Sequence, residues 1–266
     1  MKADWGDLRA RVISAAVMLG IGGVEIWLGG VWFLVLVAAL IGVMIWELCR
    51  LTAPDAPQMA LGLGVLAAVL LGTAEVMQQV PALAVLPVLV VLAVPVLAVL
   101  AAPRRDRAIA AAFAAALMLA GHGLFVLRAE AGMVAILWVL GVVIVSDVAG
   151  YFVGRALGGP KFWPAISPKK TWSGTVAGWL GAAALGYGFW VQGLGGAALI
   201  WLSPLVAFAG QMGDIGESWI KRRAGVKDAS NLIPGHGGVM DRFDALVGAM
   251  VLVMVLRAIL PLPVGG

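Results

Sequence analysis

Long runs of apolar residues with almost no charge constrain this chain more than any other feature of its sequence. About nine such runs of roughly 20 residues are separated by short breaks that carry Pro, Gly or charge. A run of this length crosses the hydrocarbon core of a bilayer as a helix. The alternating ten-residue strands of a membrane barrel are absent from the sequence. The pattern therefore predicts an all-α polytopic membrane protein and excludes a soluble globular domain.

The predicted spans have no internal repeat and no long linker between them. They cover residues 12–30, 31–49, 59–77, 82–102, 108–127, 133–153, 174–192, 197–220 and 243–262. We expect one integral membrane domain, 1–266, with N-terminal helices in 1–130 and the candidate catalytic helices and cytoplasmic loops in 131–266. The first run follows a mixed-charge start without an obvious cleavage site, which favours a retained helix over a signal peptide. Cys49 is the only cysteine, which excludes an internal disulfide.

The distribution of basic residues tests the number of spans independently. With the N-terminus in the cytoplasm, sixteen of the eighteen Lys and Arg residues fall in cytoplasmic segments, and only Arg128 and Arg257 fall on the other side. Adding or removing one span would destroy this asymmetry. The positive-inside rule therefore supports about nine spans, with the C-terminus on the side opposite the N-terminus. It also predicts that loops 154–173 and 221–242 face the cytoplasm.

Residues 214–244 form a charged cluster in a chain of which only 12% of residues are charged. A lone charge in hydrocarbon is costly, so these side chains must face water, a partner charge or a metal. The cluster holds five acids and five bases: Asp214, Glu217, Asp228, Asp241 and Asp244, with Lys221, Arg222, Arg223, Lys227 and Arg242. Chemistry is the first hypothesis for such a segment.

The acids of this cluster are spaced for convergence. Asp214, Ser218 and Lys221 follow an i, i+4, i+7 pattern and share one helical face. Asp241 and Asp244 open the ninth predicted span one turn apart, near its positive N-terminal end. Carboxylates beside phosphate-binding bases suit magnesium-dependent phosphoryl or nucleotidyl transfer. The plainer alternatives are a polar stripe in which Asp214 pairs with a base, and an N-cap aspartate, which explains either later acid but not the bases.

The loop between these helices is rich in glycine. Gly235, Gly237 and Gly238 allow left-handed backbone and close approach to a ligand, and successive N–H groups in such turns bind anions. His236 fits two roles equally, as a phosphate donor or acid and as a hydrogen bond that fixes the loop. His122 lies inside a predicted span and is expected to be structural, with a hydrogen bond inside the bundle.

A second basic segment precedes the seventh span. Lys169 and Lys170 lie in an S-P-K-K-T run that Pro160 and Pro164 precede, which favours a fixed loop suited to a triphosphate or a lipid phosphate. The alternative is simple contact with anionic lipid heads.

Two further patterns concern packing. Gly174 and Gly178 form a GxxxG motif, which is used either inside the bundle or in a dimer. Glu47 is expected to pair with Arg50, at i, i+3 on the same helix.

Residues 218–244 resemble the signature of the phosphatidate cytidylyltransferases, the CDP-diacylglycerol synthases. The fixed positions of that signature are all present: Ser218, Lys221, Arg222, Lys227, Asp228, Ser230, Ile233, Pro234, His236, Gly237, Gly238, Asp241, Arg242, Phe243 and Asp244. The resemblance extends to LRARVISAAV near the N-terminus and to the D-x-x-x-Y-x-x-G-R and S-P-K-K-T-W segments. Family members usually carry a glutamate where this chain has Ser173, so any role of that glutamate does not carry over.

The resemblance implies transfer of CMP from CTP to phosphatidic acid, which gives CDP-diacylglycerol and pyrophosphate for phospholipid biosynthesis. It implies Mg²⁺, with a monovalent cation such as K⁺ beside it, and a homodimer. The expected partners are the two substrates and membrane lipids, with no nucleic acid. The expected location is the bacterial cytoplasmic (inner) membrane, with the active site on the cytoplasmic face.

Residue roles follow from the resemblance together with the residue chemistry. The expected metal ligands are Asp214 and Asp241, and the expected catalytic residues are Asp214, Asp241, Asp244 and Lys227. The expected substrate-binding residues are Ser218, Lys221, Arg222, Asp228, His236, Gly237, Gly238, Arg242, Lys169 and Lys170. The alternatives are a CTP-dependent polyprenol kinase, a transporter with charges between broken helices, and an inactive scaffold of the same fold.

Overall fold

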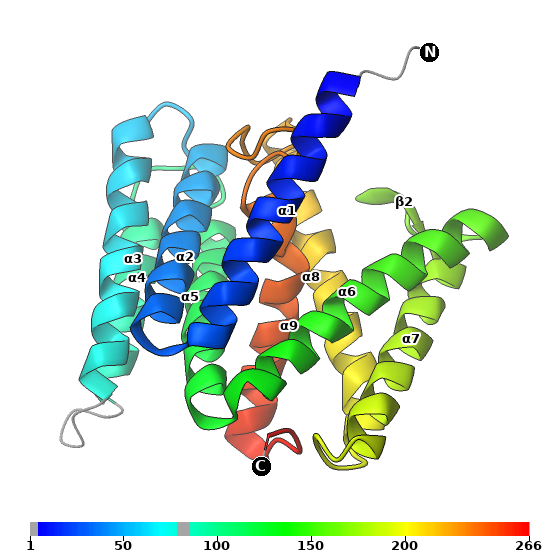
Figure 1. Ribbon diagram of the computed structural model, residues 1–266. Helices are drawn as coiled ribbons and strands as arrows, with labels where there is room; N and C mark the ends of the chain where they lie inside the picture. The colour runs from blue at the N-terminus through cyan, green and yellow to red at the C-terminus, as the bar shows by residue number, and fades with distance from the viewer. Residues whose placement is uncertain (1–4, 79–85, 266) are drawn as a thin grey trace. The chain divides into compact units, whose positions relative to one another are not determined.

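The helices follow one another in the predicted order. The computed structural model describes residues 5–78 and 86–265, and within them it contains nine helices and one two-stranded sheet (Figure 1). The helices are α1 (Trp5–Leu28), α2 (Gly30–Thr52), α3 (Pro57–Gln78), α4 (Leu86–Ala101), α5 (Arg107–Glu130), α6 (Gly132–Leu157), α7 (Trp172–Val191), α8 (Leu199–Arg223) and α9 (Met240–Ile259). Each predicted span coincides with one helix, although the start of the fourth span, 82–85, lies outside the described residues. The predicted helical architecture is confirmed.

Four of the described helices are long and apolar enough to cross a membrane, judged by length and composition. They are α2, α3 as far as Met77, α5 and α6, with mean hydropathies between 2.0 and 2.4. These helices support a membrane protein. The larger number of about nine spans and the sides on which the two termini lie stay predictions.

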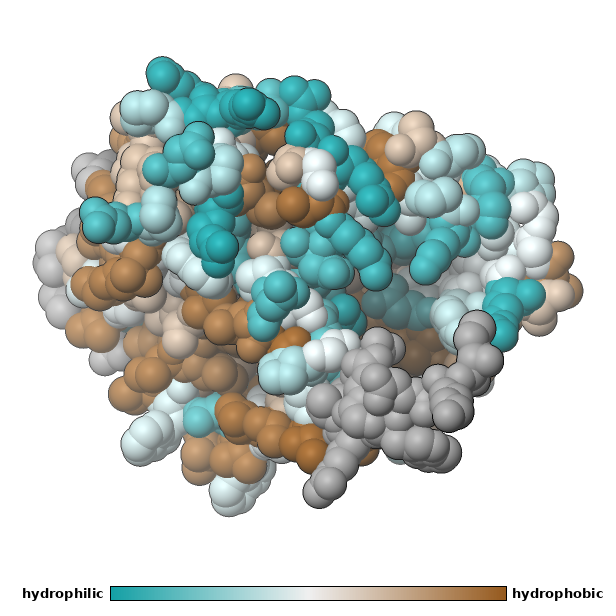
Figure 2. Space-filling view, turned by 90° about the horizontal axis from the view of Figure 1, so that it is seen from above, coloured by the Kyte–Doolittle hydropathy of each residue, from teal (hydrophilic) through white to brown (hydrophobic). Residues whose placement is uncertain are grey.

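Large apolar side chains are exposed on several helices. Leu19 on α1, Leu180 on α7 and Trp201 on α8 are each at least two thirds exposed. Brown hydrophobic surface is accordingly visible in Figure 2. Apolar surface of this extent is unfavourable in water and is expected beside lipid, which agrees with the membrane interpretation.

The segment before α7 is a β-hairpin, so the all-α description needs one amendment. Strands β1 (Lys161–Trp163) and β2 (Ser167–Thr171) pair antiparallel, with Lys161 opposite Thr171. The Phe162 ring packs edge-on against the Trp172 ring at a centroid distance of 4.7 Å. The predicted fixed loop is thus a short hairpin, because ladder hydrogen bonds and an aromatic contact hold it.

The chain divides into two compact units. The first comprises Met1–Phe125 and Arg223–Phe243, and the second comprises Val126–Arg222 and Asp244–Gly266. Most of the glycine-rich loop therefore groups with the N-terminal helices and not with the other C-terminal helices. The prediction of a single domain stays a prediction.

The core of the first unit is built from apolar side chains of α2, α3 and α5. Ile45, Leu48 and Leu71 are fully buried. Inside this apolar packing, His122 Nδ1 lies 2.6 Å from a carboxylate oxygen of the buried Glu75. The prediction that His122 is structural and hydrogen-bonded within the bundle is confirmed.

In the second unit, α6 and α7 pack closely through small residues. A Cβ atom on Gly174 would lie 2.5 Å from the backbone oxygen of Gly150, and one on Gly178 would lie 2.7 Å from Ser146 Oγ. Neither site has room for a side chain. The GxxxG motif is therefore used inside the chain, which was one of the two predicted uses.

Candidate active site

Helices α8 and α9 approach each other closely enough to bring acids from both helices together. A Cβ atom on Gly213 would lie 2.4 Å from the backbone oxygen of Asp244 and 3.0 Å from the Cα of Gly248. Only glycine allows backbones this close. The residue after Gly213 is Asp214, so the crossing places the carboxylates of Asp214 and Asp244 next to each other.

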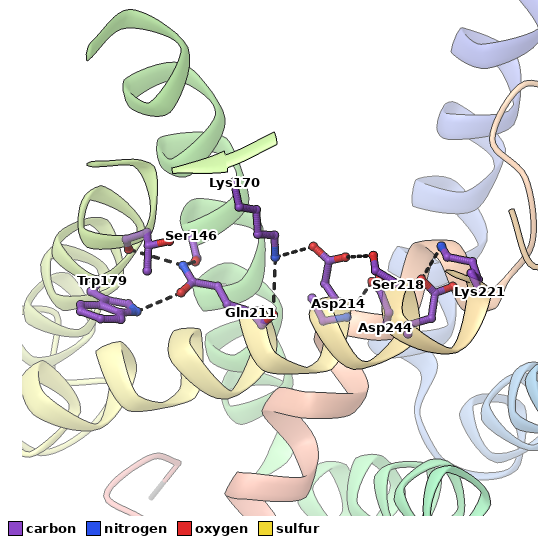
Figure 3. Close-up of polar contacts among 11 residues, drawn as sticks. Ser146, Lys170, Trp179, Gln211, Asp214, Ser218, Lys221 and Asp244 are labelled. Atoms are coloured by element: carbon purple, nitrogen blue, oxygen red, sulfur yellow. Dashed lines mark hydrogen bonds and ion pairs between the residues drawn. The ribbon is translucent and has the colours of Figure 1, made fainter. Parts of the chain in front are cut away.

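Three carboxylates gather at this crossing, all within the second unit. One oxygen from each of Asp214, Glu217 and Asp244 lies within 4.8 Å of the other two. Asp214 and Glu217 are i, i+3 on α8, which puts them on one face of that helix. Glu217 is buried, whereas Asp214 and Asp244 are half-buried. Like charges this close repel each other, so the acids need cations to stay ionised together. We call these three residues the acid cluster, of which Figure 3 labels Asp214 and Asp244.

Two lysines supply part of that positive charge. Lys170, from β2, places Nζ 2.5 Å from Asp214 Oδ2, and Lys221 forms an i, i+4 ion pair with Glu217. Ser218 Oγ donates a hydrogen bond to Asp214 Oδ1 over 3.3 Å. Asp214 and Ser218 contact each other, as their predicted shared helical face allows, whereas Lys221 contacts Glu217. The plainer prediction that Asp214 pairs with a base is confirmed. The Asp214 and Lys170 side chains keep 31% and 24% exposure, so a ligand can reach both.

A buried amide beside the cluster was not singled out from the sequence. Gln211, one turn before Asp214 on α8, accepts a hydrogen bond from Trp179 Nε1 (3.0 Å) and donates one to Ser146 Oγ (3.1 Å). Its backbone oxygen accepts from Lys170 Nζ at 3.5 Å. The three elements α6, α7 and α8 are thereby tied together beneath the lysine (Figure 3). The signal in the sequence was a glutamine directly after the apolar first half of this helix, where a buried amide must find partners inside the protein.

The glycine-rich loop lies in the first unit and closes on itself as a tight turn. Ile233 N donates to Gly237 O (2.8 Å), and His236 N and Gly237 N both donate to Ile233 O. Gly235 and Gly237 have φ angles of 72° and 85°, as predicted for left-handed positions. Gly238 is not left-handed, which differs from the prediction. It is glycine for space, because a Cβ atom there would lie 2.4 Å from Glu47 Oε1.

Asp241 is engaged by the backbone of this loop. Its Oδ2 accepts hydrogen bonds from Ala229 N (2.8 Å) and Gly238 N (2.7 Å). The carboxylate thus fixes the two ends of the loop to the first turn of α9. The three-membered acid cluster contains Asp244 and Glu217, and the ligand role expected of Asp241 stays a prediction.

Glu47, on α2, holds the same loop from the other side, and sequence reasoning missed this role. Its carboxylate accepts from Ser230 Oγ (2.6 Å), Val239 N (2.9 Å) and Met240 N (2.7 Å). The expected Glu47–Arg50 pair is wrong, since Arg50 instead lies over the Trp46 ring, 5.0 Å from its centroid. The physical reason is that the N-terminal N–H groups of α9 have no helical partner and attract an anion.

Glu47 is fully buried, and its position could not be derived from the sequence, because its partners lie about 190 residues away. The one available signal was an acid in a helix with almost no other charge. Such an acid needs a specific partner.

The remaining predicted residues lie at the surface or support the loop. Arg242 Nε donates to His236 O (3.0 Å), and His236 Nδ1 lies 2.7 Å from Ser14 Oγ. The other predicted charged residues are exposed: Lys169, Arg222, Lys227 and Asp228. Ser173 Oγ donates to Gly158 O.

Arg223, next to Arg222, forms a two-pronged contact with Asp106. Arg223 Nε and Nη2 donate to the two carboxylate oxygens over 2.9 and 2.6 Å. These hydrogen bonds hold the pKa of Asp106 below its ordinary value. This arginine is therefore a structural cation in the first unit.

The fold and the site define a helical protein with membrane-length apolar helices and a cluster of acids paired with lysines. The sequence pattern of the cytidylyltransferase family matches residues 9–260, so the chain belongs to that family.

Curated proteins that are similar to this chain carry the name of a cytidylyltransferase. The chain is 46% identical over 136 residues to a phosphatidate cytidylyltransferase of Brucella suis biovar 1 (strain 1330), with 50% of each chain covered. It is 43% identical over 136 residues to a phosphatidate cytidylyltransferase of Helicobacter pylori (strain J99), which covers 50% of this chain and 51% of that protein. It is 38% identical over 131 residues to the Bacillus subtilis (strain 168) protein of the same name, with 48% and 49% covered. The matched region spans about half the length of these relatives.

Proposed function

We propose that the chain transfers CMP from CTP to phosphatidic acid and releases CDP-diacylglycerol and pyrophosphate. The observation that carries this proposal is the acid cluster of Asp214, Glu217 and Asp244 with its two lysines. Membership of the cytidylyltransferase family and the printed names of the relatives support the same activity.

The lysines are suited to binding a triphosphate. Lys170 and Lys221 form ion pairs with Asp214 and Glu217. An ammonium group is a compact point charge on a flexible stem, so it can move from a carboxylate to a nearby phosphate oxygen. In the same unit, the exposed bases Lys169 and Arg222 extend the positive charge available to the CTP phosphates and the lipid phosphate. The phosphate-binding roles expected of Lys227 and Arg242 stay predictions.

The donor set of the acid cluster fits a magnesium ion. Magnesium prefers hard oxygen ligands, and two oxygens on one ion are at most about 4.2 Å apart. The cluster's oxygens, within 4.8 Å of one another, meet that requirement after small side-chain movements. Asp214 and Asp244, with Glu217, would hold the ion, which would neutralise charge on the phosphates and on the leaving pyrophosphate.

The reaction needs positioning more than acid–base chemistry. An oxygen of the lipid phosphate attacks the α-phosphorus of CTP, a new P–O bond forms, and the bond to the β-phosphate breaks. The attacking oxygen already carries negative charge, so no strong general base is required. Ser218 donates to Asp214 and orients this carboxylate. Asp241 and Glu47 hold the Gly237–Gly238 backbone and the start of α9 in place.

The proposal also includes the location of the active site, the oligomeric state and a second cation. The asymmetry of Lys and Arg along the chain supports an active site on the cytoplasmic face of a bacterial inner membrane, where CTP is available. A homodimer and a potassium ion beside magnesium follow from the family resemblance and belong to the same proposal.

The direct test uses purified protein in detergent with phosphatidic acid, Mg²⁺ and CTP labelled at the α-phosphate. We expect label in CDP-diacylglycerol, loss of that label with Asp244→Asn, and no loss with Asp55→Asn. Asp55 is an exposed acid in the α2–α3 turn and serves as the matched control. Both variants should keep the helical circular dichroism of the wild type.

The same assay separates the alternatives. Label transferred from γ-labelled CTP to a polyprenol, with none from the α position, would replace the proposal by a CTP-dependent lipid kinase. No transfer from either position, in protein that remains folded, would favour the scaffold or transport hypotheses.

A further inference from the structure

Arg104, in the connection between α4 and α5, uses only one end of its guanidinium group within the chain. Its Nη1 donates to Thr52 Oγ1 (3.0 Å) and to Cys49 Sγ (3.3 Å), both on α2. Among the described residues, its Nε and Nη2 have no hydrogen-bond partner, although both atoms are shielded from water. Buried donors are normally satisfied, and an unpaired donor on a charged group is costly. These two atoms therefore need a partner from outside the chain.

The unpaired atoms form the edge of a guanidinium group that recognises oxyanions. Nε–H and Nη2–H point in the same direction and match two oxygens of one carboxylate or phosphate. Two other arginines of this chain use the same two atoms in this way: Arg223 binds Asp106, and Arg257 binds Glu130. The chemistry of the Arg104 edge thus selects an anionic ligand with paired oxygens.

The connection that carries Arg104 is fixed at three successive residues. The Arg104 side chain is bound to Thr52, and Arg105 N donates to Thr52 O (3.1 Å). Asp106 has a φ angle of 53°, which is uncommon outside glycine, and its carboxylate is held by Arg223. All of these residues belong to the first unit. A connection held in this way presents the guanidinium edge in a defined direction.

Positive charge predominates around this edge. Residues 103–107 carry three arginines and one aspartate, and that aspartate is already paired. Arg105, Arg107 and Arg50 are exposed, and the exposed Asp55 offsets one of these charges. A neutral water molecule would not balance the excess charge. The excess favours an anion with several charged oxygens, which is a phosphate group and not a single carboxylate.

We propose that the Arg104 edge binds one phosphate group, with Arg105 and Arg107 supplying further positive charge. The phosphate is carried by a lipid headgroup or by a soluble ion, which share this chemistry. Arginines at the ends of membrane-length helices such as α2 and α5 lie where lipid phosphates are available. Binding requires the side chains that cover the edge to change rotamer, which is common when a ligand binds.

The test measures the melting temperature by tryptophan fluorescence in dodecyl maltoside, a detergent without phosphate, and in the absence of Mg²⁺ and CTP. The two probes are inorganic phosphate and dihexanoyl phosphatidylglycerol, with dihexanoylglycerol as the phosphate-free control for the lipid. A ligand that binds the folded protein raises the melting temperature with its concentration, which gives an apparent Kd. We expect at least one phosphate probe to do so in the wild type.

Variants locate the bound phosphate. Arg104→Gln should raise the apparent Kd about 10- to 100-fold, the scale of losing hydrogen bonds to a charged group. Arg104→Lys keeps the charge but not the two-pronged edge, so it should bind as weakly as Arg104→Gln, and it decides the question if Arg104→Gln does not fold. Arg257→Gln, which removes an arginine of the second unit, should keep the wild-type Kd.

The outcomes also identify the source of the phosphate. Protection by the lipid alone assigns a lipid headgroup, and protection by inorganic phosphate alone assigns a soluble ion. The inference is overturned if neither probe protects the wild type, or if Arg104→Lys binds as tightly as the wild type. It is also overturned if Lys170→Gln abolishes protection and Arg104→Gln does not, because the phosphate then binds at the acid cluster. No catalysis is measured, so the result is independent of the proposed function.

Discussion

Acidic residues do different work in the acid cluster and in the glycine-rich loop. In the acid cluster, Asp214 and Glu217 contact lysine side chains, which are mobile and exchangeable. In the loop, Glu47 and Asp241 accept hydrogen bonds mainly from backbone N–H groups, which are fixed. Carboxylates whose lysine partners can leave are suited to a metal, and the released lysines are suited to phosphates, whereas carboxylates bound to backbone determine shape. The comparison teaches that the acids of this chain differ in their partners, which are exchangeable lysines in the acid cluster and mainly fixed backbone groups in the loop.

The largest expected effect is on catalysis, in the acid cluster. Asp214→Asn removes a charge that pairs with Lys170 and should lower kcat by roughly 10²–10³-fold, the scale of lost electrostatic stabilisation in a transition state. The melting temperature should change little, because the asparagine amide keeps the shape of the side chain. Initial rates and tryptophan-fluorescence melting measure both quantities. A fall in melting temperature as large as that of a core mutant would assign Asp214 a structural role.

Glu47→Ala, in contrast to Asp214→Asn, should lower the stability of the protein. It leaves three donors of the loop and of α9 without their acceptor in a buried site, at a cost of about 1–3 kcal/mol for each group that stays unsatisfied. The melting temperature should fall clearly, and activity should fall with it because the loop loses its support. Glu47→Gln, which retains one acceptor oxygen, should lie between the wild type and Glu47→Ala. An unchanged melting temperature in Glu47→Ala would remove the distinction between the two regions.

The approach of α8 and α9 offers a third test. Gly213→Ala inserts a methyl group 2.4 Å from Asp244 O and must push the helices apart, at a cost of about 1–3 kcal/mol. Because the crossing brings Asp214 and Asp244 together, kcat should fall although no charged residue has changed. Gly188→Ala, on α7 with nothing within 4 Å of the new atom, is the control. Equal activities of the two variants would show that the close crossing does not position the acids.

The smallest effect concerns the exposed pair of Asp106 and Arg223. The pKa of Asp106 is lowered in the folded protein by hydrogen bonds from Arg223, so the pair stabilises the fold above the ordinary aspartate pKa. That contribution disappears as the pH falls through the lowered folded-state pKa. Asp106→Asn should therefore melt slightly below wild type at neutral pH and together with it in acid. A difference that grows on acidification would contradict this assignment.

Much of the fold was predictable, because helix position depends on local hydrophobicity. Nine described helices coincide with the predicted runs, and Gly174 and Gly178 pack as a small-residue motif. The hairpin at Lys161–Thr171 was expected only as a fixed loop, since strand pairing depends on contacts that composition does not reveal. The acids of the candidate site were predicted as a group, but which of them would cluster was not.

The sequence by itself determined the class of protein, the order of helices, the family signature and most of the charged residues at the candidate site. Local composition and fixed spacing determine these features. Only the tertiary structure decided that Asp214, Glu217 and Asp244 form one cluster, that Lys170 reaches it from β2, and that Glu47 and Ser14 hold the loop. The physical reason is distance along the chain: hydrogen bonds between residues about 190 to 220 positions apart depend on how helices pack, and no local pattern encodes that packing.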